Sequence, residues 1–295
     1  MSPSLLLYML CVCSVLVQDT SECPVIHINT ERGPDSYKYP HITTIVQGDQ
    51  IQQIFENVSS VLLDKQEDRF REFLAVNDVT ALPTDCQDVK TMGHTQSGVY
   101  SIYPKSTLGF PVYCDMDNGA WTVIQRRING SVDFKRDWRS YLTGFGKPEH
   151  EYWFGNQQIH LLTTSSWYQL KIEMMNENKE TKQVTYDIFY ISDAESGFTL
   201  FVDGFHGDDG IEDDLMTSHI GNKFSTIDRD QDTYSGSCAA SYNGGWWYSK
   251  CHRANLNGLY GGLNARGIHW YTWGGHGTSL IMSEMKIRRF QRDLF

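Results

Sequence analysis

Between Gly204 and Gly277 the sequence runs for about seventy residues with no clear helical or strand period. This segment is rich in Gly, Asn, Asp and Trp. Stretches of that length without regular structure are unusual inside a compact domain, and where they occur they tend to be functional. We therefore expect regular elements on either side of the segment, and the functional site within it.

Two cysteines and a group of aromatic residues lie in this segment. Cys238 and Cys251 are 13 residues apart, and a disulfide between them would contribute on the order of 3 kcal/mol in the chain-entropy model. The aromatic side chains could form a binding wall or a small core around such a disulfide, and both interpretations can hold for different rings. These residues are Tyr242, Trp246, Trp247, Tyr248, Tyr260, Trp270, Tyr271 and Trp273.

The chain has seven cysteines, and two of them lie in an apolar run near its start. Leu5–Val17 is too short to span a bilayer, so we expect residues 1–20 to be a signal peptide and the protein to be secreted and extracellular. Five cysteines remain, of which four can pair in an oxidising compartment. Cys23 is the odd one, and it could bridge to another chain or stay a free or capped thiol. We expect no membrane span, because no later stretch is apolar for long enough.

Two segments precede the main domain. Residues 21–44 hold three prolines and no clear period, which predicts an extended tail. Within residues 45–80 apolar side chains recur at spacings of three and four, which predicts a helix. About four heptads are near the lower limit for a coiled coil, so the helix could form a short oligomerising coiled coil or lie on the downstream domain. Asn57 begins a glycosylation sequon there.

Residues 81–295 have the pattern of an α+β domain. Short runs of β-type residues, most of them alternating apolar and polar, predict strands, and two segments between them predict short helices. The strands are expected near residues 98–103, 110–113, 121–126, 168–173, 184–190, 198–202 and 283–288, and the helices near 137–143 and 156–162. Asn129 begins a second sequon.

The charge balance argues against nucleic acid as a partner. The chain has 36 acidic and 25 basic residues, a formal net charge of −11 at pH 7. Such a surface repels phosphate backbones and lacks a polybasic membrane patch.

An acidic turn at residues 228–236 is a candidate cation site. Asp228, Asp230 and Asp232 alternate, and a hard cation such as Ca²⁺ needs oxygen ligands from a looping backbone. The EF-hand pattern fails, because Thr233 stands where that loop needs Gly and Ala239 where it needs Glu. A solvated turn and a calcium loop of another type both remain open.

Catalytic patterns are weak. Cys251 and His252 are adjacent, but neighbours in sequence seldom face each other and a disulfide would remove the thiolate. The acidic residues at 208–209 and 212–214 could imitate a carboxylate pair, but we expect a solvated loop. No motif of a serine hydrolase, zinc protease, P-loop or Rossmann enzyme occurs. We expect the protein not to be an enzyme.

Many local motifs occur in an order that resembles one known family. The segments are Asp85–Cys86, His94–Pro104, Val112–Met116, Gly119–Arg127, Glu151–Asn156, Phe224–Asp228, Cys251–His252, Asn255–Leu259 and Glu284–Arg288. Together they resemble the fibrinogen C-terminal domain of fibrinogen chains, ficolins, tachylectins and angiopoietins. The resemblance implies a globular α+β domain with a central antiparallel sheet and an irregular C-terminal calcium and ligand subdomain.

The resemblance also implies pairings and ligands for this sequence. The disulfides would be Cys86–Cys114 and Cys238–Cys251. Calcium would be held by the carboxylates of Asp230 and Asp232 and by the backbone carbonyls of Tyr234 and Gly236, with Asp228 in support.

A ligand pocket is implied as well. In sugar-binding members a cis peptide, here Lys250–Cys251, aims the backbone N–H groups at the positions of Cys251 and His252 toward an acetyl carbonyl. Aromatic rings then surround the acetyl methyl group, which needs an apolar cup. Tyr242 and His252 match this wall, whereas Asn264 and His276 stand where aromatic residues are usual.

Two functions follow as expectations. The first is a secreted, calcium-binding lectin for N-acetylated glycans on microbial or cell surfaces, in innate immune recognition. The chain lacks a collagen-like tract, so the helix and Cys23 would make it a homo-oligomer and supply avidity. The alternative is a receptor ligand or extracellular-matrix module of the angiopoietin or tenascin type, because this fold supports both functions.

Overall fold

The computed structural model describes residues 82–104, 107 and 109–290. The predicted signal peptide, tail and helix lie outside the described residues, as do Cys23 and Asn57. What is described is the domain that begins near residue 81.

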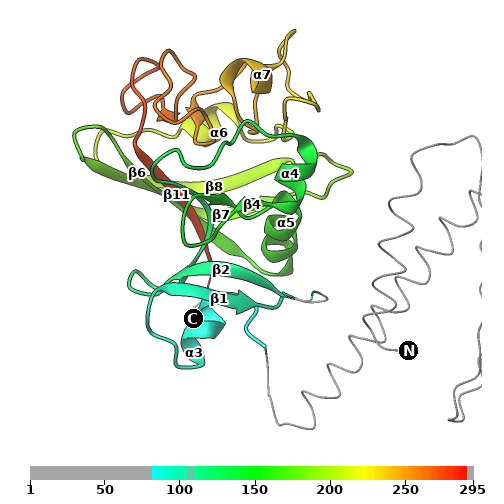
Figure 1. Ribbon diagram of the computed structural model, residues 1–295, viewed down its shortest axis with the longest axis vertical. Coiled ribbons are helices and arrows are strands. Elements are labelled where there is room, and N and C mark those ends of the chain that lie inside the picture. Colours follow the sequence, from blue (N-terminus) through cyan, green and yellow to red (C-terminus); the bar gives the residue numbers. More distant parts are fainter. Residues whose placement is uncertain (1–81, 105–106, 108, 291–295) are drawn as a thin grey trace, which may run out of the picture. The chain divides into compact units, whose positions relative to one another are not determined.

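A nine-stranded sheet forms the centre of this domain (Figure 1). All of its strand pairs are antiparallel, and its main order is β1-β2-β3-β11-β6-β7-β8, with β5 pairing β3 and β4 beside this path. The strands are β1 Gly98–Ile102, β2 Phe110–Asp115, β3 Trp121–Arg127, β4 Phe145–Gly146, β5 Tyr152–Trp153, β6 Tyr168–Met175, β7 Thr181–Ile191, β8 Leu200–Gly207 and β11 Met282–Arg289. The expected antiparallel α+β architecture is confirmed, and each predicted strand is present.

The last strand closes the sheet. β11 lies between β3 and β6 and pairs with both of them (Figure 1, red). β6 buries every second side chain, as the alternating sequence predicts, whereas every residue of β3 is buried. The chain therefore leaves the sheet at its β8 edge and returns through its middle, which anchors the intervening segment at both ends.

Three helices lie between residues 86 and 165, and two of them begin at a side-chain cap. They are α3 Cys86–Thr91, α4 Trp138–Thr143 and α5 Asn156–Ser165. Asp85 accepts hydrogen bonds from the Gln87 and Asp88 N–H groups of α3, and Asp137 accepts one from the Ser140 N–H of α4. The α4 and α5 predictions are confirmed, whereas α3 was not predicted. In the part of the chain that the structure describes, no helix is long and apolar enough to cross a membrane.

The segment after β8 contains little regular structure, as expected. It holds only short elements, α6 Asp214–Ser218, α7 Cys238–Tyr242, and the two-stranded pair of β9 Ala254–Asn255 with β10 His269–Trp270. In Figure 1 these elements gather at one end of the sheet, opposite β1, β2 and α3. We call residues 208–281 the loop region.

Polar side chains of β3 connect the sheet to the loop region. The buried amide of Gln125 donates to the backbone oxygen of Leu256 at 2.9 Å and to Asn257 Oδ1 at 3.2 Å. The buried guanidinium of Arg127 donates to the Gly258 backbone oxygen at 2.7 Å. A buried backbone carbonyl outside a sheet needs such a partner, so these bonds fix residues 256–258 on the sheet.

One prediction about this region holds only in part, because Asp208, Asp209 and Glu212 are exposed but Asp214 is not. We expected the acidic residues at 208–209 and 212–214 to form a solvated loop, but Asp214 is fully buried. Its carboxylate accepts hydrogen bonds from Arg253 Nε at 2.8 Å and from the Thr272 backbone N–H at 2.9 Å. Asp213 caps α6 and accepts from the Tyr186 hydroxyl. The sequence pattern of clustered carboxylates did not show that two of them have partners elsewhere in the chain.

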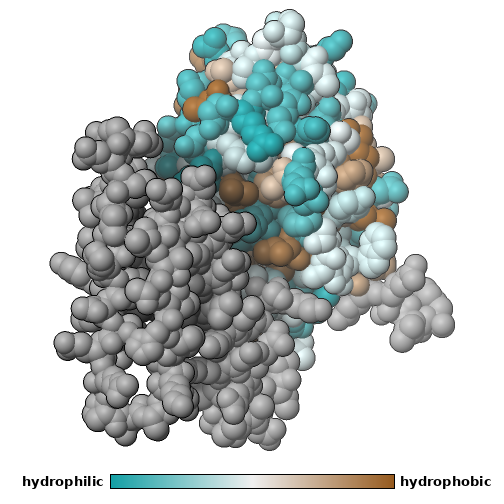
Figure 2. Space-filling view, turned by 90° about the vertical axis from the view of Figure 1, so that its right-hand side faces the viewer, coloured by the Kyte–Doolittle hydropathy of each residue, from teal (hydrophilic) through white to brown (hydrophobic). Residues whose placement is uncertain are grey.

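The described surface visible in Figure 2 is mixed. Hydrophilic residues cover most of its upper part, and hydrophobic residues form small groups between them. Small apolar groups are normal on a protein surface. Where the described surface is visible, a concave site is therefore a better candidate for function than a wide apolar face.

Candidate ligand-binding site

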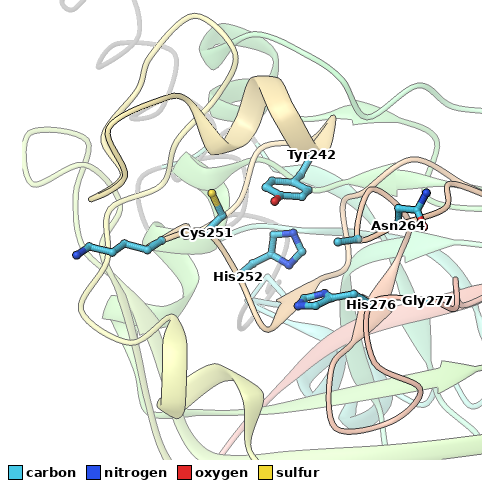
Figure 3. A pocket seen from close by; sticks show the side chains of 8 residues that line it. Tyr242, Cys251, His252, Asn264, His276 and Gly277 are labelled. Atoms are coloured by element: carbon cyan, nitrogen blue, oxygen red, sulfur yellow. The ribbon is translucent and has the colours of Figure 1, made fainter.

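A pocket of about 440 Å³ lies in the loop region (Figure 3). All six residues predicted from the sequence to bind ligand line it. Two further lining residues, Ala265 and Gly277, were not predicted, because each follows a predicted wall residue and has no side-chain chemistry of its own. The full lining is Tyr242, Lys250, Cys251, His252, Asn264, Ala265, His276 and Gly277.

A disulfide and a cis peptide bond shape one side of the pocket. Cys238 and Cys251 are bonded, with their Cα atoms 5.5 Å apart, and the Lys250–Cys251 peptide is cis. The second disulfide, Cys86–Cys114, joins α3 to β2 far from the pocket in sequence. Both pairings implied by the family resemblance are therefore present.

Two consecutive backbone N–H groups are free at this side of the pocket. Among the described residues, neither the N–H of Cys251 nor that of His252 makes a hydrogen bond to the protein. The next two N–H groups, of Arg253 and Ala254, are both bonded. Because both residues line the pocket, these two N–H groups are candidate donors to a ligand oxygen.

His219 holds the backbone that follows these donors. Its Nε2 accepts from the N–H groups of Arg253 at 3.2 Å and Ala254 at 3.0 Å. Its Nδ1 must therefore carry the proton, which it donates to the Trp247 carbonyl at 2.8 Å. Burial lowers the pKa of His219 to about 4, which keeps the ring neutral. Sequence reasoning missed His219, since its partners lie far along the chain.

The side chain of Asp214 stabilises the same turn. Arg253 Nε contacts Asp214 Oδ1 at 2.8 Å, and the Arg253 guanidinium lies over the Tyr271 ring, 4.8 Å from its centroid. Asp214 also accepts the Thr272 N–H. The carboxylate thereby connects Arg253, just before β9, to Thr272, just after β10.

The His252 ring occupies the middle of the pocket. In Figure 3 it lies between the rings of Tyr242 and His276. Its centroid is 4.4 Å from that of Tyr242, which it meets edge to face, and 5.7 Å from that of His276. Burial, followed by the neighbouring His269, lowers the pKa of His252 to about 2. The ring is therefore neutral and presents an apolar face beside Tyr242.

The wall formed by Asn264 and Ala265 is less aromatic than the side with Tyr242 and His252. The Ala265 N–H donates to the backbone oxygen of His276 at 2.8 Å. Asn264 has a positive φ of 55°, a conformation that Asn tolerates better than most residues. Both Asn264 and His276 are exposed, so polar groups replace apolar ones at the mouth of the pocket.

Most other aromatic residues of the loop region form a core and not a wall. Trp246, Trp247, Tyr248 and Trp270 are fully buried. Trp247 Nε1 donates to the Phe198 carbonyl at 2.7 Å, which satisfies the indole inside this core. Of the eight aromatic residues singled out in the sequence, only Tyr242 lines the pocket. The core interpretation holds for the buried rings, whereas a role of Tyr242 in a binding wall stays a prediction.

The acidic turn lies beside the disulfide. Asp232 accepts from the N–H groups of Tyr234 and Cys238, both at 2.9 Å, and Asp230 accepts from the Asp232 N–H at 3.2 Å. Burial, reinforced by the Asp230 carboxylate, raises the pKa of Asp232. Within the described residues neither carboxylate has a Lys, Arg or His partner. The donor chemistry, two carboxylates and the carbonyls of Tyr234 and Gly236, fits a hard cation.

Asp228 has a different role from its two neighbours. Its Oδ1 accepts from the Trp138 N–H at 2.8 Å and from the Thr226 hydroxyl at 2.7 Å. These bonds attach the turn to the first residue of α4. This position agrees with a supporting role beside the turn.

The second sequon lies on an exposed turn. Asn129 is exposed, and its side-chain oxygen accepts from the Ser131 N–H at 3.0 Å. The Glu151 carboxylate accepts from the N–H groups of Ile128, Asn129 and Gly130 and orders this turn. A glycan at Asn129 would have access, and its presence stays a prediction.

The chain is similar to several known proteins. Microfibril-associated glycoprotein 4 of Bos taurus is 46% identical over 220 residues, which cover 70% of this chain and 86% of that protein. Techylectin-5A of Tachypleus tridentatus is 40% identical over 254 residues, which cover 81% of this chain and 84% of that protein. The solved fibrinogen-like globe domain of human ANGPTL2 is 36% identical, with a TM-score of 0.67, over 70% of this chain and 99% of that one.

A family profile also matches nearly the whole described domain. The profile described as "Fibrinogen beta and gamma chains, C-terminal globular domain" matches residues 82–290. The two disulfides and the antiparallel sheet agree with the resemblance found from the motifs. The chain belongs to the family of fibrinogen C-terminal globular domains.

Proposed function

We propose that the protein is a secreted lectin that recognises N-acetyl groups of glycans on microbial or cell surfaces. The observation that carries the proposal is the pair of free backbone N–H groups at Cys251 and His252, in a pocket that also holds the Tyr242 ring. An acetyl group needs donors for its carbonyl oxygen and an apolar surface for its methyl group. Residues that line the pocket can supply both. That the protein is a binding module and not an enzyme is part of this proposal.

Similarity to techylectin-5A, a lectin by its name, supports this function. A single sugar pocket of this size binds weakly, so the proposal includes a homo-oligomer that gains avidity. Cys23 and the helix expected within residues 45–80 would join the subunits, and secretion would follow from the signal peptide. The expected role is in innate immune recognition.

Calcium is the proposed cofactor. Asp230 and Asp232 would hold the ion together with the carbonyl oxygens of Tyr234 and Gly236, and the ion would neutralise two carboxylates that have no cationic partner among the described residues. At one hundred times its dissociation constant calcium would stabilise the fold by about 2.7 kcal/mol. Isothermal calorimetry should show binding that D232N weakens and that D209N, a change in an exposed carboxylate outside the turn, leaves unchanged. Equal calcium affinity in D232N would contradict this site.

Retention on N-acetylglucosamine beads tests the function. The full-length secreted protein should bind the beads and elute with free N-acetylglucosamine but not with glucosamine, which lacks the acetyl group. Y242A should abolish retention, whereas W167A, which removes an exposed aromatic ring elsewhere, should not. Elution by a calcium chelator as well would show that the pocket depends on the acidic turn. Failure of the folded oligomer to bind would contradict the lectin proposal.

The alternative is a receptor ligand or matrix module that uses the same loops against a protein. Asn264 and His276 favour it, because they replace apolar wall residues with exposed polar ones. Similarity to microfibril-associated glycoprotein 4 and to the ANGPTL2 domain supports it equally. If the beads do not retain the protein, the same variants should be compared for binding to cultured cells and to extracellular matrix.

A further inference from the structure

Three histidines meet below the ligand pocket. His252 and His276 line the pocket, and His269, on β10, lies behind them with 1% of its surface exposed. One ring nitrogen from each lies within 4.8 Å of one from each of the others. Three neutral imidazoles at such distances are unusual as mere packing, because each ring carries a polar nitrogen that needs a partner.

His252 is the member without a partner. It is 9% exposed, and neither Nδ1 nor Nε2 has a hydrogen-bond partner among the described residues. His219, which is also buried, shows the contrast, because both of its ring nitrogens are bonded to backbone groups. A buried imidazole with two free nitrogens calls for a bound water or ion.

The other two rings are oriented for the same centre. His269 Nδ1 lies 3.3 Å from the Gly267 carbonyl oxygen, which leaves Nε2 pointing to the cluster. A backbone carbonyl on the second nitrogen is the usual way to orient a metal-binding histidine. His276 Nδ1 lies 3.2 Å from His269 Nε2. Two nitrogens bound to one tetrahedral zinc ion at about 2.0–2.1 Å would be about 3.3 Å apart, so this pair already has the required separation.

We propose that His252, His269 and His276 bind one Zn²⁺ ion at the floor of the pocket. Three imidazoles suit zinc and copper and not the oxygen-preferring calcium ion, so this site is separate from the acidic turn. The hydrogen bond between His276 and His269 gives way to two metal bonds, and the His276 proton moves to Nε2. A nitrogen of His252, which lies within 4.8 Å of the other two, would take the third position.

The fourth coordination position faces the pocket. His252 and His276 line the cavity, whereas the buried His269 does not, so the open side of the ion would be toward the ligand. An open position on zinc accepts water or an oxygen of a ligand. Zinc and an acetylated sugar would therefore influence each other, although the metal site does not depend on the lectin function.

Calorimetry with zinc chloride tests the proposal on the full-length, calcium-loaded protein. The expected result is one zinc site per chain that H276Q weakens at least tenfold. H206Q is the matched control, because His206 is an exposed histidine outside the cluster, and it should leave this site unchanged. H269N should also weaken binding, and near-ultraviolet circular dichroism confirms that each variant is folded.

The outcomes separate this proposal from the lectin proposal. Loss of zinc binding in H276Q and H269N, with retention in Y242A, supports the site even if no variant binds N-acetylglucosamine. Zinc affinity that is equal in the wild type, H276Q and H269N would overturn it, because binding would then involve other residues. Absence of zinc binding by the folded wild type would overturn it as well.

Discussion

The sheet and the loop region are stabilised in different ways. In the sheet, backbone ladders satisfy the polar groups and alternating side chains such as those of β6 form the core. In the loop region, backbone groups are bonded to one another in short turns, and buried side chains, among them Gln125, Arg127 and His219, bond further backbone groups. A disulfide joins the two ends of its central turn.

This difference explains where the pocket lies. A regular ladder leaves few backbone donors free, whereas a chain held by individual side chains can keep two N–H groups unpaired at Cys251 and His252. The sheet supplies rigidity and the loop region supplies free polar groups. Damage to the sheet should therefore unfold the domain, and damage to the loop region should remove the pocket first.

The largest effect is expected from K286A, in the middle of the sheet. Lys286 is 1% exposed and contacts Asp115 at 2.6 Å and Glu173 at 2.8 Å. Its removal leaves the buried Asp115 carboxylate without a cationic partner among the described residues and should lower the free energy of unfolding by about 3–5 kcal/mol. Urea unfolding measures this change, and spectroscopic signals from the sheet and from the loop region should show the same unfolding transition. K171A is the control, because Lys171 lies 3.9 Å from Glu173, and it should cost about 1 kcal/mol or less.

Removal of the disulfide in the loop region should cost about 3 kcal/mol. We expect the double variant C238S/C251S to lose sugar binding and to exchange the amide hydrogens of residues 238–252 faster, while the β6 and β7 amides stay protected. Hydrogen exchange followed by mass spectrometry makes this comparison. Equal loss of protection in the sheet and the loop region would contradict the difference between them.

H219Q should have a smaller effect at neutral pH. The Gln amide cannot both accept from the Arg253 and Ala254 N–H groups and donate to the Trp247 carbonyl as the imidazole does, so the change should cost about 1–3 kcal/mol at pH 7. The pKa of His219 is about 4 in the folded protein, against about 6.5 when unfolded, so the unfolded chain binds more protons between these values. Stability due to His219 is therefore complete above pH 6.5 and falls by at most about 1.4 kcal/mol for each pH unit below it.

The difference in unfolding free energy between wild type and H219Q should thus shrink as the pH falls from 7 to 4. Thermal or urea unfolding at several pH values measures it. A difference that is constant over this range would show that His219 is not held neutral by burial.

The sequence predicted the sheet well and the loop region only in part. Alternation in residues such as Tyr168–Glu173 marks a strand because burial in a sheet has a period of two. The pocket residues were found through the family resemblance, and the structure brings Tyr242, His252, Asn264 and His276 together.

The supporting residues could not be found in this way. His219 and Asp214 act on Arg253, which is 34 and 39 positions away, and no local pattern encodes such contacts. The acidic run around Asp214 was misinterpreted because a buried and a solvated carboxylate look the same in sequence. His269 was overlooked because only the fold places it beside His252, which is 17 positions away in the sequence.

A titration followed by nuclear magnetic resonance tests the central claim most directly. The ¹⁵N-labelled protein is titrated with N-acetylglucosamine and, separately, with glucosamine. The free backbone N–H groups predict that the amide signals of Cys251 and His252 shift with the acetylated sugar and not with glucosamine, while signals from β6 and β7 do not move. Unchanged Cys251 and His252 amides, or equal shifts with both sugars, would contradict the claim that these two donors recognise the acetyl group.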